Sequence, residues 1–282
     1  MTSGKTIKEI RDIAVLKIGR SDADALLKNV LSCDEIYLLV HKDDIMKKED
    51  LKRFASYVKR RENKESVAYI TGEKEFMSLM FYVDKNVLVP RWETELLVEE
   101  IINADIKKDE ILDLCTGSGA IAVSLKYYLK NSSLVGVDIS DGALLVAKKN
   151  AKNILKNDDV TFLKLDVLSE TEKLNKKFDV VVSNPPYIET DVIKTLDSDV
   201  KDFEPHLALD GGCDGLMFYR KIASDAKYIL KKGGYIFFEI GFNQGDALKE
   251  ILKDNFTDIE VKNDYAGLPR IVTARFVGWF FG

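Results

Sequence analysis

The sequence predicts an α/β fold in which a largely parallel sheet, covered by helices on both faces, follows a small helical bundle. Two observations carry this prediction. After about residue 90, short apolar segments typical of strands alternate with segments whose apolar residues recur at helical spacing, a pattern typical of parallel sheets. Before about residue 72 the helical spacing occurs alone, with no Gly-rich loop and no strand-like alternation.

The first 72 residues predict a helical bundle. Apolar residues recur at helical spacing over Ile7–Ile18 and over Ala23–Leu31. Ser21 stands just before two acidic residues, which is typical of the start of a helix. Further helices are expected from about Lys48 to Arg61 and over Ser66–Tyr69.

A β-hairpin is expected next. Glu75–Val83 is rich in strand formers, Asp84–Asn86 is a turn signal, and Val87–Val89 is apolar. We therefore predict two strands that turn at residues 84–86 and join the two halves of the chain. This divides the chain into a helical domain over residues 1–72, a hairpin linker over 73–90 and an α/β domain over 91–282.

Seven strands and the helices between them are predicted in the α/β domain, each from its apolar pattern. The candidate strands are Ile111–Leu114, Leu134–Asp138, Val160–Leu165, Phe178–Ser183, Gly234–Ile240, Ile259–Lys262 and Ile271–Val277. The clearest helices are Thr94–Ala104, Ala120–Leu129, Gly142–Ile154 and Leu216–Leu230.

Composition excludes several classes of protein. With 282 residues, 46% of them hydrophobic, the chain has material for one or two packed cores. Three distant cysteines predict no disulfide framework, and two isolated histidines predict no metal site. No apolar run approaches the roughly 20 residues that span a bilayer, and no signal core opens the chain, so a cytoplasmic protein without membrane contact is expected.

Charge is divided unevenly along the chain. The net charge of −5 comprises about +2 for residues 1–86, with 17 basic against 15 acidic residues, and −7 for the rest. The acidic α/β half argues against a stable nucleic-acid partner. A basic cluster in the first half is either a solvated helix face or a docking surface for an acidic macromolecule. It consists of Lys47, Lys48, Lys52, Arg53, Lys59, Arg60, Arg61 and Lys64.

Three acidic residues lie at the carboxyl ends of successive predicted strands. Asp113 begins the loop Asp-Leu-Cys-Thr-Gly-Ser-Gly119, whose glycines let backbone N–H groups approach a ligand at a helix N-terminus. Asp138, 19 residues beyond Gly119, suits the hydroxyls of a ribose, and Asp166 could reach an adenine amino group. The pattern indicates a nucleoside cofactor; alone, the loop also fits a nicotinamide dinucleotide or a turn without ligand.

The segment Ser183-Asn-Pro-Pro-Tyr-Ile188 follows the fourth predicted strand of the α/β domain. Consecutive prolines cannot extend a strand ladder, so a rigid loop is expected at the ligand-binding edge of the sheet. The Asn184 amide oxygen and the Pro185 carbonyl form a rigid pair of acceptors beside the Tyr187 ring. This arrangement suits the binding of a planar NH2 group, with its nitrogen directed at an electrophile over the glycine loop.

These two motifs resemble the amino-methylating class I S-adenosylmethionine-dependent methyltransferases, which have a Rossmann-like fold. More narrowly, the chain is similar to the HemK/PrmC family, which methylates the glutamine side-chain amide in the Gly-Gly-Gln motif of peptide-chain release factors. The resemblance extends over nearly the whole chain and includes an N-terminal helical domain joined by a β-hairpin. It also rests on Tyr69–Phe76, Val87–Glu95, Phe203–Gly212, Asp214–Leu216, Glu239–Gly241, Gln244–Gly245 and Asp264–Arg270.

The resemblance implies S-adenosylmethionine as cofactor, with S-adenosylhomocysteine as product, and a monomer acting on release factors. It implies that Asn184 and the Pro185 carbonyl bind the two amide hydrogens, with Tyr187 against the amide plane, and that no general base is required. Residues expected to bind the cofactor are Asp113, Cys115, Thr116, Gly117, Ser118, Gly119, Asp138, Asp166, Val167 and Asn184. Those expected to bind the substrate are Asn184, Pro185, Pro186, Tyr187, Arg91 and Thr94.

Two residues depart from the family pattern. Trp92 stands where the family usually has the second proline of Pro-Arg-Pro-Glu-Thr-Glu, and Cys115 stands where a glycine often follows Asp-Leu. Because cysteine is small, we expect cofactor binding to survive.

Two other functions remain open. Methyltransferases that act on the amino groups of adenine or guanine in RNA or DNA share the Asn/Asp-Pro-Pro-Tyr motif. The acidic α/β half and the accessory motifs count against that alternative. A non-catalytic cofactor-binding protein is disfavoured because the glycine loop, the ribose carboxylate and the paired acceptors occur together.

Overall fold

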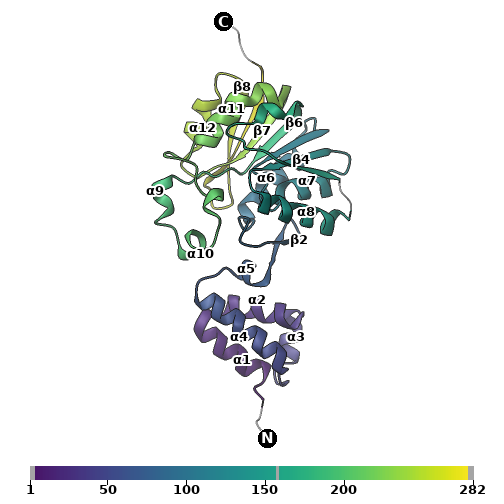
Figure 1. Cartoon of the computed structure of the whole chain (residues 1–282), viewed down its shortest axis with the longest axis vertical. Helices are drawn as coiled ribbons and strands as arrows, with labels where there is room; N and C mark the ends of the chain where they lie inside the picture. Colours follow the sequence, from purple (N-terminus) through teal and green to yellow (C-terminus); the bar gives the residue numbers. More distant parts are fainter. Residues whose placement is uncertain (1–3, 157–158, 279–282) are drawn as a thin grey trace. The chain divides into compact units, whose positions relative to one another are not determined.

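The computed structural model describes residues 4–156 and 159–278, which form two compact units (Figure 1). The N-terminal unit comprises the described residues up to Glu73 together with Ser198–Phe203. The α/β unit comprises Lys74–Asp197 and the described residues from Glu204 onward. A short segment from the middle of the chain therefore packs with the first helices.

The N-terminal unit is helical, as predicted. Thr6 and Glu9 form a reciprocal capping box at the start of the first helix, and Leu26, Leu27 and Phe54 are fully enclosed in the core. The six-residue α3 was not predicted, because it is too short to show periodicity. The helices are α1 (Ile7–Ile18), α2 (Arg20–Leu31), α3 (Glu35–Val40), α4 (Lys48–Glu62) and α5 (Val67–Thr71), joined by α10 (Ser198–Lys201).

Two arginines of the basic cluster hold this unit together. Arg60 donates to Glu65 and to the backbone carbonyls of Tyr69 and Ile70. Arg61 donates to Asp22 at 2.5 Å and to Asp199 at 2.8 Å. Both guanidinium groups are thus neutralised in place, so the surface charge of the cluster comes chiefly from its lysines.

The β-hairpin exists, but its predicted strands and turn are wrong. Its strands are β1 (Glu73–Phe76) and β2 (Leu79–Tyr82), and the turn lies at Met77–Ser78, where both φ angles are positive, 51° and 56°. Such turns are usually signalled by Asn-Gly, which is absent here. The Asp84 side chain does accept a hydrogen bond from the Asn86 backbone N–H, but this turn opens a loop that leads to the next helix.

The seven-stranded sheet is confirmed. Its order is β5-β4-β3-β6-β7-β9-β8, and it is parallel except for β9, which runs antiparallel to both neighbours. The strands are β3 (Glu110–Leu114), β4 (Ser133–Asp138), β5 (Val160–Lys164), β6 (Phe178–Ser183), β7 (Leu230–Glu239), β8 (Phe256–Asn263) and β9 (Pro269–Phe276).

Helices cover both faces of this sheet (Figure 1). Strand residues alternate between the faces: Ile111 packs in one hydrophobic cluster and Leu112 in the other. One face carries α6 (Trp92–Asn103), α7 (Ala120–Tyr128) and α8 (Asp141–Leu155), and the other carries α11 (Met217–Ile229) and the unpredicted α12 (Gly245–Leu252). Short turns complete the unit: η1 (Thr171–Leu174), α9 (Thr190–Ile193) and η2 (His206–Ala208).

The strand order creates a ligand crevice. The chain moves from β3 outward to β4 and β5, then returns to the other side of β3 with β6. At such a switch point the carboxyl ends of the strands leave a crevice where open α/β sheets bind ligands. Within the described ranges, no helix has the length and apolar character needed to cross a membrane.

Candidate active site

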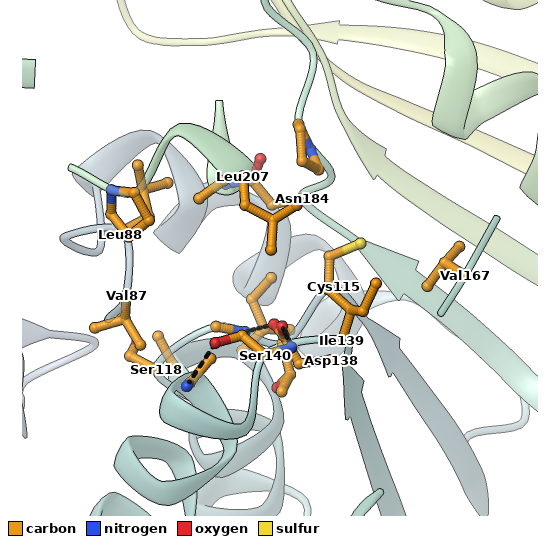
Figure 2. Close-up of a pocket in the computed structure, with 18 of the residues that line it drawn as sticks. Val87, Leu88, Cys115, Ser118, Asp138, Ile139, Ser140, Val167, Asn184 and Leu207 are labelled. Atoms are coloured by element: carbon orange, nitrogen blue, oxygen red, sulfur yellow. Dashed lines mark hydrogen bonds between the residues drawn. The ribbon is translucent and has the colours of Figure 1, made fainter. Parts of the chain in front are cut away.

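A cavity lies at the carboxyl ends of β3, β4, β5 and β6 (Figure 2). Loops after all four strands contribute to it, and so do residues 86–91 and 205–208. Most of the predicted site residues line this one cavity. They are Arg91, Thr94, Cys115, Thr116, Gly117, Ser118, Asp138, Asp166, Val167, Asn184 and Pro186.

Asp113 and Gly119 do not line the cavity; they shape its floor. Asp113 is completely buried, and its Oδ2 accepts from the Thr116 hydroxyl at 2.6 Å and from the Ala122 N–H at 3.2 Å. Burial raises the pKa of Asp113 to about 7. Gly119 has φ +77°, and a Cβ there would meet Ala147 at 3.1 Å. Together they hold the glycine loop against the start of α7, and their predicted contact with a cofactor stays a prediction.

Asp138 lies at the edge of the cavity beside the glycine loop. Its Oδ2 accepts from the Gly117 N–H and its Oδ1 from the Ser140 N–H, both at 2.9 Å. Burial raises the pKa of Asp138. The Asp166 oxygens similarly accept from the Leu168 N–H and the Ser169 hydroxyl. Each carboxylate is fixed in orientation and retains further lone pairs, so the acceptors fit the hydroxyls and amino group of a nucleoside.

Apolar residues that the sequence reasoning missed form the walls of the cavity. Val87 and Leu88 lie on the side opposite Val167 in Figure 2. A signal was available for some of these residues, because Val87–Pro90 had already been matched as part of a motif without being assigned to the site. The additional lining residues are Asn86, Val87, Leu88, Pro90, Ala120, Ile121, Ile139, Ser140, Ala143, Leu165, Leu168, Pro205, Leu207, Ala208 and Phe218.

An ion pair joins two loops at the rim. Arg91 donates to Oε1 of the buried Glu204 at 2.7 Å, and Pro205 and Leu207 continue from Glu204 along the wall. Burial raises the pKa of Glu204, although the Arg91 charge opposes this effect. Arg91 is therefore already engaged within the chain, where it positions the rim.

The Asn184–Tyr187 loop is braced from behind. Gln244 Nε2 donates to the Tyr187 carbonyl at 3.0 Å and to the Gly215 carbonyl at 3.2 Å. Gly215 has φ +69°, and a Cβ there would lie 2.3 Å from the Tyr187 carbonyl oxygen. Burial raises the pKa of the Tyr187 hydroxyl. Neither Tyr187 nor Pro185 lines the cavity, so their proposed contacts with a substrate stay predictions.

Asn184 presents a free acceptor beside the cavity. Its Nδ2 donates to the Thr94 hydroxyl at 3.2 Å, and that hydroxyl donates to Glu239 Oε2 at 2.6 Å. Oδ1 of Asn184, a cavity residue labelled in Figure 2, accepts no hydrogen bond from the described part of the chain. Nowhere in residues 4–156 and 159–278 do three or more His, Cys, Asp or Glu cluster in a way that could hold a metal ion.

Family models match both units of the chain. The PrmC N-terminal domain matches residues 16–72, and the Methyltransferase small domain matches residues 92–203. Solved structures share the fold at low identity. A methyltransferase from Pyrococcus furiosus has a TM-score of 0.55 and 17% identity, over 79% of this chain and 99% of that one. The hMettl16 catalytic domain, solved with the MAT2A 3′UTR hairpin 6, has a TM-score of 0.55 and 16% identity, covering 84% and 83%.

Curated relatives are much more similar. The release factor glutamine methyltransferase of Clostridium acetobutylicum is 42% identical over 258 residues, covering 90% of each chain. Its namesake from Clostridium botulinum is 40% identical, covering 90% of this chain and 91% of the relative. That of Thermodesulfovibrio yellowstonii is 38% identical and covers 95% and 97%. At this identity and coverage, the chain belongs to the family of release factor glutamine methyltransferases.

Proposed function

We propose that this chain transfers a methyl group from S-adenosylmethionine to the side-chain amide nitrogen of the glutamine in the Gly-Gly-Gln motif of peptide-chain release factors. The observation that carries the proposal is the free Asn184 acceptor, which lies in the same cavity as the glycine loop and Asp138. The relatives named for this activity support the choice of substrate.

The cavity has suitable residues for the cofactor. The fixed carboxylates of Asp138 and Asp166 and the apolar wall around Val167 suit the polar and planar parts of a nucleoside. S-adenosylmethionine, when bound, supplies an electrophilic sulfonium methyl group and leaves as S-adenosylhomocysteine. Cys115 and Thr116 line the same edge of the cavity.

The paired acceptors address the chemical difficulty of the reaction. An amide nitrogen is a poor nucleophile because its lone pair is delocalised into the carbonyl. Asn184 Oδ1 and the Pro185 carbonyl accept the two amide hydrogens, and they bind them more strongly as positive charge develops on nitrogen. This is stabilisation directed at the transition state. Tyr187 packs against the amide plane and limits its orientation.

No protein base is required for the final proton loss. Once methylated, the amide nitrogen is strongly acidic and loses its proton to water. Neither histidine lines the cavity: His41 belongs to the N-terminal unit and His206 begins η2. The site therefore works by alignment and rigid acceptors.

The helical part of the chain is proposed to recognise the protein substrate. In this proposal residues 1–72 bind the release factor away from its target loop, residues 73–90 link the parts, and residues 91–282 carry the chemistry. Residues of one chain form the cavity, so a monomer would suffice for the proposed activity. A substrate that belongs to translation supports a cytoplasmic location, and no stable nucleic-acid partner is proposed.

The proposal is tested by incubating the protein with labelled S-adenosylmethionine and, separately, with release factor or RNA. We expect label on the Gly-Gly-Gln glutamine, located by peptide mass spectrometry. Label in RNA would favour the nucleic-acid alternative, and label in neither substrate would reject the proposed activity.

The Asn184→Ala variant tests the acceptor itself. We expect S-adenosylmethionine affinity to stay within about tenfold and the rate of methylation to fall roughly 10²-fold or more. Asn131→Ala, at an exposed position outside the cavity, is the matched control. Full activity in Asn184→Ala would rule out the paired-acceptor mechanism.

A further inference from the structure

We infer that Thr94 and Glu239 act as a positioning relay that fixes the Asn184 side-chain amide with its oxygen toward the substrate. The inference rests on the proposed function, since it concerns how that site acquires its acceptor. Thr94 enters from α6, Asn184 follows β6, and Glu239 ends β7. Three elements distant in sequence thus meet in one chain of hydrogen bonds.

The geometry of the relay is continuous. Asn184 Nδ2 lies 3.2 Å from the Thr94 hydroxyl, and that hydroxyl lies 2.6 Å from Glu239 Oε2. Thr94 is 4% exposed and Glu239 is 2% exposed, so water does not compete for these bonds. The Tyr219 hydroxyl donates to the Glu239 backbone carbonyl at 2.7 Å and fixes the end of β7.

The protons available to each group determine which group donates and which accepts in the relay. An ionised carboxylate only accepts hydrogen bonds, and a threonine hydroxyl has a single proton to donate. Once Thr94 donates to Glu239, its oxygen can only accept, so the Asn184 NH2 group must face Thr94. The Asn184 oxygen is then left for the substrate. An inverted amide would place its NH2 against the NH2 of the target glutamine, and two donors would meet.

Glu239 acts only through Thr94. It does not line the cavity, whereas Thr94 and Asn184 both do. Burial opposes the ionised form of Glu239 most strongly, and the Glu93 charge adds to this effect. The hydrogen bond from Thr94 and the charges of Arg270 and Arg91 favour the ionised form. A neutral residue of similar size would avoid the cost of burying a carboxylate. The need to fix the direction of the Thr94 hydrogen bond accounts for the presence of a carboxylate at this buried position.

The test compares two substitutions at one position. Thr94→Val keeps the shape of the side chain but removes the hydroxyl, and Thr94→Ser keeps the hydroxyl. With release factor as substrate, we expect kcat to fall about 10- to 100-fold in Thr94→Val, because a misoriented acceptor costs alignment. We expect Thr94→Ser to stay within about threefold of the wild-type kcat. KM for the release factor and the Kd for S-adenosylmethionine should change little in either variant.

A matched control separates positioning from stability. Thr171 also donates its hydroxyl to a buried carboxylate, Asp225, but lies outside the cavity. Thr171→Val should lose a similar bond and a similar amount of stability, measured by urea unfolding, and yet keep the wild-type kcat. An equal loss of kcat in both valine variants would show that the effect of Thr94 is general destabilisation.

Glu239→Gln provides a second, independent test. The glutamine amide can donate to Thr94 or accept from it, so the direction of the relay is no longer imposed, and kcat should fall while S-adenosylmethionine still binds. If Thr94→Val folds and retains the wild-type kcat, the relay is overturned. If Thr94→Val does not fold, a wild-type kcat in Glu239→Gln overturns it instead. Absence of methyl transfer by the wild-type protein would instead reject the proposed function.

Discussion

Cys115 has a backbone conformation that explains why glycine often occupies this place in the family motif. Its φ is +60°, in the left-handed region that costs most side chains roughly 1–2 kcal/mol. The thiol lies at the cavity wall, where burial raises its pKa well above the usual range. The departure noted in the sequence therefore places a strained residue next to the cofactor site.

This strain predicts that glycine at position 115 gives a more stable protein than alanine, the reverse of the usual order. We expect the free energy of unfolding of Cys115→Gly to exceed that of Cys115→Ala by about 0.5–1 kcal/mol, because only glycine adopts a positive φ without cost. Urea unfolding of both variants measures this difference. At the exposed Lys148 within α8, the same pair should show the ordinary order, with alanine more stable. If Cys115→Ala were more stable than Cys115→Gly, the backbone at residue 115 would be unstrained.

Residues that follow strands could be predicted from the sequence, but residues that act across elements could not. Asp138 ends a recognisable apolar strand and Asn184 follows one, so their place at the sheet edge was evident in advance. Glu239 was only part of a matched motif. Its partner Thr94 is 145 residues away in sequence, and only the packing of α6 against β7 brings the two together.

At the scale of elements, the loop after β6 depends on close backbone contact with the Gly211–Gly215 turn. A Cβ at Gly215 would lie 2.3 Å from the Tyr187 carbonyl oxygen and 2.7 Å from Gln244 Nε2. One added carbon would therefore displace the Tyr187 end of the loop that carries Asn184. The turn sets the position of the acceptors without contacting the cavity itself.

We expect Gly215→Ala to lower the free energy of unfolding by about 2 kcal/mol or more and to reduce methylation, because it combines strain with a backbone clash. Gly267→Ala is the matched control: φ is +81° there, and no atom of the described residues other than its chain neighbours lies within 4 Å of the added carbon. It should cost about 1 kcal/mol, from strain alone. Urea unfolding and a methylation assay measure both variants, and equal effects would exclude the contact with Tyr187.

The helices and sheet strands that were predicted match the structure to within a few residues, whereas the hairpin turn does not. The central strands β3 and β6 have strong apolar patterns because they are buried on both faces of the sheet. Met77 and Ser78 adopt positive φ although neither is a residue that favours it. Tertiary contacts hold them there: Glu95 accepts from the Met77 N–H, and the Tyr128 hydroxyl donates to its carbonyl. Such contacts leave no signal in the local sequence.

At the scale of the whole molecule, the lysines of α4 are the part of the basic cluster still available to a partner. Lys48 and Lys52 are exposed, one turn apart, and have no ion pair within the described chain. We expect the Lys48→Glu, Lys52→Glu double variant to raise KM for the release factor about threefold or more, because a like charge weakens encounter with an acidic partner. S-adenosylmethionine affinity should not change.

The Lys148→Glu, Lys152→Glu variant is the control, since this exposed pair has the same spacing on α8 and gives the same change in net charge. Steady-state kinetics at low and high salt compares the two, because surface attraction weakens as salt is added. An equal rise in KM for both variants would indicate a general charge effect. An unchanged KM for both would leave the cluster as solvated surface.

Buried carboxyl groups predict that stability and activity respond to pH in opposite directions. Burial raises the pKa of Glu239 and of Asp113 to about 7 each, above the ordinary values of 4.5 and 3.8 for these side chains. Between about pH 4.5 and pH 7 the folded protein therefore binds more protons than the unfolded chain, and its free energy of unfolding falls as pH rises. The relay needs the ionised form of Glu239, so kcat should rise as the pH increases through about 7.

Glu239→Gln isolates the contribution of one of these groups. Arg270, Arg91 and Glu93 act on the Glu239 carboxyl, but they remain in the variant, so the comparison removes only its titration. We expect the loss of stability between about pH 5.5 and 8 to be smaller in Glu239→Gln than in the wild type, as measured by urea unfolding. The same loss in both proteins would mean that Glu239 does not titrate in this window. The rise of kcat with pH would then need a different group.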